Sequence, residues 1–172
     1  MMRLSVVFGL LLAMLWSLAE AQTLRYRGHD LQVSDQARAC YLVFVKLYDA
    51  AYYRDDSGKL RCVRLDYLRG FSREELVEAT QQIFATLHGD DALRDQRAQL
   101  QPFLEGYMAV QPGDTYQYCV DRTQGGEMLR DGMVVASIDD PDFGERFLNI
   151  WVTGEQQGRP QWNFSRCPGT VF

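Results

Sequence analysis

The chain has 172 residues, of which 47% are hydrophobic, and its 18 basic and 23 acidic residues give a formal net charge of −5 at pH 7. This length is that of one ordinary domain, and the sequence contains no internal repeat, low-complexity tract or block of like charges. An acidic chain without a basic cluster is a poor candidate for binding nucleic acid or an anionic membrane surface.

The first 21 residues contain the three parts of a secretory signal peptide in order. Arg3 supplies the positive charge, residues 4–18 are almost entirely apolar, and residues 19–21 read A-E-A, which fits a cleavage site. A membrane anchor is the weaker alternative, because the apolar run is shorter than the about 20 residues that span a bilayer. We expect cleavage near Ala21, a single mature domain at 22–172 without a transmembrane segment, and a periplasmic or secreted location.

The four cysteines, Cys40, Cys62, Cys119 and Cys167, all follow the predicted signal peptide, so they meet an oxidising environment. Two disulfides are expected, and four cysteines allow three connectivities. The sequence has no C-x-x-C motif, so zinc binding and thiol redox chemistry are weaker alternatives. We expect no metal and no cofactor.

The mature chain opens with a short hairpin-like stretch that turns at Gly28. Residues 41–53 are almost continuously apolar, which is typical of a strand covered on both faces. Turn-forming residues at 54–59 predict a loop, and an alternating strand follows at 60–68. These two strands are expected to form a hairpin.

Alternation in the second strand points Val63, Leu65 and Tyr67 inward and Cys62 outward. In the expected hairpin, Cys40 lies on the order of 30 Å beyond the partner of Cys62. Bridged Cα atoms lie within about 7 Å of each other, so a Cys40–Cys62 disulfide is excluded. Each of these cysteines must pair with one of the other two.

Two helical regions follow. Ser72 and Glu75 form a capping box that begins a helix, and Gly89 ends it. A second region at about 91–110 should be broken or kinked at Pro102, which predicts two pieces with the proline opening the second.

Strands are then expected at 115–121, 128–129 and 133–138, with a tight turn at Asp131-Gly132. Asp140 caps the last helix. The buried stripe of this helix comprises Phe143, Phe147, Ile150 and Trp151. The order of elements predicts an α+β fold, in which helices pack on one face of an antiparallel sheet.

Several segments resemble the bacterial exported branch of the chalcone isomerase-like family. They are "VFVKLYDAAYY", "LRCVRLDYLR", "QPGDTYQY" and "DPDFGERFLNIWVTG", and the resemblance extends from about residue 31 to 154. It implies an open-faced β-sandwich with a ligand cleft between the sheet and the helices. In this family some members close a chalcone into a flavanone, and others bind fatty acids without catalysis.

The resemblance also implies an arginine that holds the anionic group of the ligand. This arginine should fall near Gln36, and Arg38 is the nearest candidate. Tyr48 falls where the enzymes have a polarising threonine, and residues 72–88 contain no tyrosine, although the enzymes draw a catalytic tyrosine from that region. The catalytic pattern is therefore not retained.

Arg38, Tyr48 and Tyr118 are the candidate ligand-binding residues, and Arg38 and Tyr48 are the candidate catalytic ones. A guanidinium on an apolar wall holds a carboxylate or phenolate, and a phenol offers a proton to a polar head. The alternatives are an exposed arginine and two tyrosines that pack in the core. His29 and His88 have no partners for a catalytic triad.

Three functions remain open. The first is a non-catalytic binder of a small amphipathic ligand such as a fatty acid, and the second is an intramolecular lyase (isomerase) acting on an unknown substrate. The third is an envelope scaffold for an unknown protein partner, which Trp162 and Phe164 would favour if they were exposed together.

The tail at 155–172 contains two prolines and two glycines, so we expect a disulfide at Cys167 to hold it. Cys62 and Cys119 fall on the outward side of their strands, where a tail crossing the outer face of the sheet would reach them. We predict that Cys167 bonds one of these two and that Cys40 bonds the other, with a free thiol at Cys40 as the weaker alternative.

Overall fold

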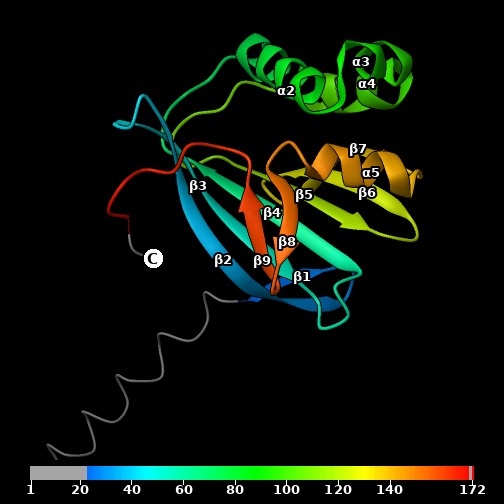
Figure 1. Cartoon of the computed structure of the whole chain (residues 1–172), viewed down its shortest axis with the longest axis horizontal. Coiled ribbons are helices and arrows are strands. Elements are labelled where there is room, and N and C mark those ends of the chain that lie inside the picture. The colour runs from blue at the N-terminus through cyan, green and yellow to red at the C-terminus, as the bar shows by residue number, and fades with distance from the viewer. Residues whose placement is uncertain (1–22, 171) are drawn as a thin grey trace, which may run out of the picture.

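The computed structural model describes residues 23–170 and residue 172, so the predicted signal peptide lies outside the described residues. One curled antiparallel sheet has its seven strands in sequence order, and a two-stranded hairpin follows (Figure 1). The strands of the sheet are β1 Thr23–Tyr26, β2 His29–Tyr41, β3 Val45–Arg54, β4 Leu60–Tyr67, β5 Thr115–Asp121, β6 Gly125–Arg130 and β7 Met133–Ile138. The hairpin comprises β8 Val152–Gln156 and β9 Arg159–Trp162.

The four helices of the described residues lie on one side of this sheet (Figure 1). They are α2 Arg73–His88, α3 Asp90–Asp95, α4 Arg97–Gly106 and α5 Pro141–Leu148. The β8–β9 hairpin covers the same side over β2 and β3, beside α5 (Figure 1). We call the covered side the inner face and the opposite side the outer face. The expected α+β fold with helices on one face is confirmed.

Alternation along β4 sorts its residues between the two faces as predicted. Val63, Leu65 and Tyr67 belong to the main core cluster beneath the helices. Cys62 belongs to a second, smaller cluster on the outer face. The residues of this outer cluster are Tyr26, Leu31, Ala51, Tyr53, Leu60, Cys62, Cys119 and Leu129.

The predicted continuous strand at 41–53 is wrong at its beginning. β2 ends at Tyr41, residues 42–44 form a turn, and β3 begins at Val45. Leu42 and Val43 have φ values of 49° and 73°, so the backbone reverses direction here. The apolar pattern did not reveal this turn, because hydrophobic residues fill positions where turn-forming residues are usual.

The capping box of Ser72 and Glu75 is confirmed, since each side chain accepts a hydrogen bond from the other residue's amide. The predicted break at Pro102 is wrong, because the two helical pieces separate at Gln96 and the proline lies inside α4. Proline at this position removes one helical hydrogen bond. Burial of the apolar side of α4 keeps the segment helical across it, through Leu100, Phe103 and Leu104.

All four cysteines form disulfides, but the predicted partner of Cys167 is wrong. Cys62 faces Cys119 directly across β4 and β5 and bonds it. Cys167 bonds Cys40, with 127 residues between them. The exclusion of a Cys40–Cys62 bond is confirmed.

The path of the tail explains the correct pairing. The β8–β9 hairpin folds over the inner face, so the tail reaches the free edge of β2 and does not cross the outer face. Two backbone hydrogen bonds extend the sheet there, from the Cys40 amide to the Ser165 carbonyl (2.8 Å) and from the Cys167 amide to the Arg38 carbonyl (2.9 Å). The disulfide therefore fixes a short additional strand to β2.

The two disulfides should differ in their resistance to reduction under native conditions. Cys62 and Cys119 are fully buried, whereas Cys167 is partly exposed. We expect mild dithiothreitol without denaturant, followed by alkylation and peptide mass spectrometry, to label Cys40 and Cys167 first. Labelling of Cys62 and Cys119 at the same rate would contradict this order.

Replacing Cys40 and Cys167 by alanine should lower the free energy of unfolding by about 2–5 kcal/mol.

Candidate functional site

The structure places Arg38 and Tyr48 on opposite faces of the sheet. In the β2–β3 pairing, Arg38 lies opposite Asp49, and the next pair joins Ala39 to Tyr48. Because neighbouring residues of a strand point to opposite faces, these two side chains diverge. Tyr48 packs in the main core beneath the helices and the tail, and Arg38 lies on the outer face. The candidate anion holder and the candidate proton donor therefore do not share a site.

Tyr48 and Tyr118 lie in the inner cleft, which aromatic side chains fill. The Tyr48 ring contacts the edge of Phe164 at a centroid distance of 5.5 Å. The Tyr118 ring packs on Phe147 at 4.9 Å, and its hydroxyl donates to the Gly144 carbonyl at 3.0 Å. Both side chains are therefore part of the core packing in this structure.

The cavity that remains in the inner cleft has a volume of about 10 Å³. This is the space of a single water molecule and far below that of a small-molecule site. Its lining comprises Val63, Leu65, Tyr67, Tyr107, Tyr116, Gln117, Tyr118, Met128 and Trp151. A fatty acid or a chalcone would enter this cleft only if the helices moved away from the sheet.

Burial also sets the acidity of the tyrosines in this cleft. It raises the pKa of Tyr107 to about 12. Burial, together with the nearby Tyr107, raises the pKa of Tyr48, and burial raises the pKa of Tyr118. A phenol with a raised pKa is a weaker acid, so Tyr48 is a poor proton donor where it stands.

These pKa shifts predict cooperative unfolding at high pH. The folded-state pKa values lie above the value of about 10 for an unfolded tyrosine, so the folded chain holds protons that the unfolded chain releases. The stabilisation is complete below pH ~10 and is lost as the pH rises through the folded-state values. We expect phenolate absorbance and loss of circular dichroism to change together above pH ~10. Full ionisation of the tyrosines with the fold intact would contradict this expectation.

A buried charged cluster lies on the inner face at the opposite end of β4, and sequence analysis missed it. Arg61 is only 5% exposed, and its guanidinium pairs with Glu145 of α5. Next to it the Tyr52 hydroxyl donates to Glu155 of β8. Burial lowers the pKa of Arg61, and its Nε atom has no hydrogen-bond partner among the described residues. The sequence contains a signal for this position: Arg61 lies two residues before Val63 in the predicted strand, so its side chain points to the same, inner face.

An open groove of about 480 Å³ lies beside Arg38, between the β2–β3 turn and the tail. Arg38 is held by two bonds to Asp49, from Nε to Oδ1 at 2.5 Å and from Nη2 to Oδ2 at 2.7 Å. Lys46 is exposed and has no ion pair among the described residues. The full lining comprises Arg38, Cys40, Val43, Phe44, Lys46, Cys167, Pro168, Gly169 and Thr170. The groove thus combines two cations with apolar side chains.

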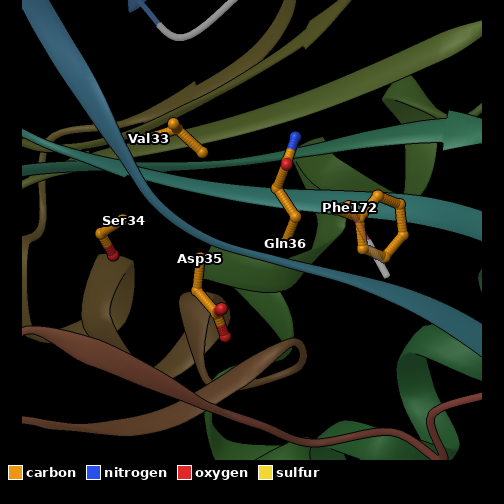
Figure 2. A pocket seen from close by; sticks show the side chains of 5 residues that line it. All are labelled: Val33, Ser34, Asp35, Gln36 and Phe172. Carbon is orange, nitrogen blue, oxygen red and sulfur yellow. The ribbon is translucent and has the colours of Figure 1, made fainter. Parts of the chain in front are cut away.

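A second hollow of about 290 Å³ lies along the free edge of β2. Ser34 and Asp35 point to one side of the strand, and Val33 and Gln36 point to the other, with Phe172 beside Gln36 (Figure 2). The Ser34 hydroxyl donates to the Gly158 carbonyl at 3.0 Å, so part of this edge is already bound by the β8–β9 turn. The lining of this hollow includes the Asp35 carboxylate and no cation.

The tail aromatics are packed and not exposed together. Trp162 and Phe164 are partly buried, and their rings contact each other at 5.1 Å. The Trp162 indole donates to Asp35 at 2.9 Å. Because Trp162 and Phe164 are not exposed together, the structure does not support a docking role for these two side chains.

Across residues 23–170 and 172, no group of three or more histidine, cysteine, aspartate or glutamate side chains is arranged to hold a metal ion. No helix within this part of the chain has the length and apolar character needed to cross a membrane.

Comparisons with known proteins agree with this geometry. A family model described as chalcone isomerase-like matches residues 17–157. A fatty-acid binding protein from Arabidopsis thaliana has a similar crystal structure, with a TM-score of 0.55 and 12% sequence identity. The match covers 78% of this chain and 90% of that one, and at this identity it shows a common fold. No curated protein matches the sequence significantly.

Proposed function

Because the chain belongs to the chalcone isomerase-like family, we propose that it is an exported, non-catalytic protein that binds a small amphipathic anion such as a fatty acid. The observation that carries this proposal is the open groove beside Arg38. Its volume of about 480 Å³ lies within the range of about 300–1,000 Å³ that is usual for small-molecule sites.

The lining of the groove suits an amphipathic anion. Lys46 supplies a positive charge that no described carboxylate neutralises, and Arg38 keeps donors that Asp49 does not use. Val43, Phe44 and Pro168 offer apolar surface to an alkyl chain. A carboxylate would lie between the two cations, with its chain along the apolar wall.

The divergence of Arg38 and Tyr48 supports binding over catalysis. Intramolecular ring closure needs a held oxyanion next to a proton donor, and these two side chains lie on opposite faces of the sheet. The inner cleft leaves about 10 Å³ for a substrate. Tyr48 and Tyr118 would contact a ligand only after this cleft opened.

Export is supported by the cysteines. Both disulfides require an oxidising compartment, which matches the predicted signal peptide and the predicted cleavage near Ala21.

Calorimetric titration with dodecanoate tests the proposal, using the chain from Gln22 onward, which contains every described element. We expect Lys46→Gln to weaken binding about three- to tenfold, because it removes one charge-assisted contact. The matched control is Lys59→Gln, which removes the only other lysine of the chain, next to the β3–β4 turn.

A second pair of variants addresses Arg38. Arg38→Gln should weaken binding. Arg64→Gln is the matched control and should leave binding unchanged, because Arg64 also pairs with a carboxylate on the outer face, Asp66, but does not line the groove. Absence of dodecanoate binding, or equal loss in both members of either pair, would contradict the groove as the ligand site.

A further inference from the structure

The turn between β2 and β3 exposes four consecutive hydrophobic residues. Tyr41, Leu42, Val43 and Phe44 are 61%, 61%, 62% and 76% exposed, and we call this segment the tip. Figure 1 shows the turn between β2 and β3 extending past the end of the sheet. Single exposed hydrophobic residues are normal, but four in succession on a projecting turn indicate a contact surface.

The backbone of the tip is strained by the residues that occupy it. Leu42 and Val43 have positive φ values, and a β-branched residue such as Val43 is a genuine outlier there. Three other hairpin turns among the described residues place glycine in the second positive-φ position, at Gly28, Gly132 and Gly158. The tip therefore has hydrophobic side chains where asparagine or glycine would make the folded chain more stable.

Three basic residues lie on segments next to the tip. Lys46 is the second residue of β3, and Arg166 pairs with Ala39 of β2 through the backbone. Arg69 follows Leu68, whose amide donates to the Leu47 carbonyl of β3. All three side chains are exposed and form no ion pair among the described residues. The nearest carboxylate of β3, Asp49, is already paired with Arg38.

We propose that the tip docks the protein on the surface of an anionic lipid bilayer. Leu42, Val43 and Phe44 enter the boundary between the headgroups and the acyl chains, and Tyr41 lies at the level of the headgroups. The three cations lie at the level of the lipid phosphates.

The size and shape of the tip favour a bilayer over a protein partner. A stable protein interface buries about 800 Å² on each side, which is far more than one projecting turn of four residues provides. A bilayer needs only shallow insertion of a few apolar side chains with cations beside them. The whole chain has a net charge of −5, so attraction to anionic lipid is confined to the three cations next to the tip. Docking through so few charges is reversible, and salt weakens it.

This inference goes beyond the proposed ligand function and is separable from it. Val43 and Phe44 belong to the tip and also line the groove, whereas Tyr41 and Leu42 belong to the tip alone. Leu42 is therefore the position at which membrane docking is tested alone.

The test is co-sedimentation of the chain from Gln22 onward with vesicles of phosphatidylcholine and phosphatidylglycerol, and with vesicles of phosphatidylcholine alone. We expect binding to the mixed vesicles that weakens in high salt and is lower without phosphatidylglycerol. Leu42→Asn should weaken it about tenfold while raising the melting temperature, since asparagine tolerates positive φ. A loss of binding therefore cannot be ascribed to misfolding.

The beginning of β7 provides matched controls, because Met133 and Val134 are 69% and 55% exposed there. Val134→Asn should leave vesicle binding unchanged. Tryptophan fluorescence of Phe44→Trp should shift to the blue and be quenched by brominated lipid, whereas that of Met133→Trp should not.

Failure of the unsubstituted chain to bind mixed vesicles would overturn the proposal, as would equal weakening by Leu42→Asn and Val134→Asn. A dimer in sedimentation equilibrium that Leu42→Asn dissociates would assign the tip to a second copy of the chain and would also overturn it. Dodecanoate affinity should be the same in Leu42→Asn as in the unsubstituted chain, so the two proposals fail by different measurements.

Discussion

Aromatic packing on the inner face of the sheet determines how the rest of the molecule is organised. Phe103 of α4 stacks on Phe147 of α5 at a centroid distance of 4.4 Å, and Phe147 in turn contacts Tyr118 of β5. This stack holds both helices against the sheet and leaves about 10 Å³ of free space. Because the cleft between the layers is filled, the groove that we propose as the ligand site lies at the edge of the sheet.

That edge is formed by β2, which β1 covers only as far as Gln32. The tail binds the far end of the exposed edge through Cys167 and two backbone hydrogen bonds, and this leaves the groove between the tail and the β2–β3 turn. The disulfide therefore has two effects: it protects an open strand edge and it builds one wall of the proposed ligand site. The same turn supplies the other wall and the exposed tip.

Sequence patterns predicted the fold well where one local signal was sufficient. The capping box at Ser72, the cap at Asp140 and the alternation of β4 each specify an element through contacts within a few residues. Predictions about the candidate site were less complete, because the register between β2 and β3, which puts Arg38 and Tyr48 on opposite faces, cannot be read from the sequence. The burial of the Arg61 guanidinium was also missed, although the alternation of β4 puts Arg61 on the same face as Val63.

The sequence by itself determined the α+β class, the family resemblance, the participation of four cysteines in disulfides and the exclusion of a Cys40–Cys62 bond. Only the tertiary structure decided that Cys167 bonds Cys40, that Arg38 and Tyr48 diverge and that residues 42–44 are a turn. The physical reason is the same in each case. Which face a side chain occupies, where one strand turns into the next, and which edge the tail reaches all depend on strand pairing and register, and a single-residue shift of register reverses the face.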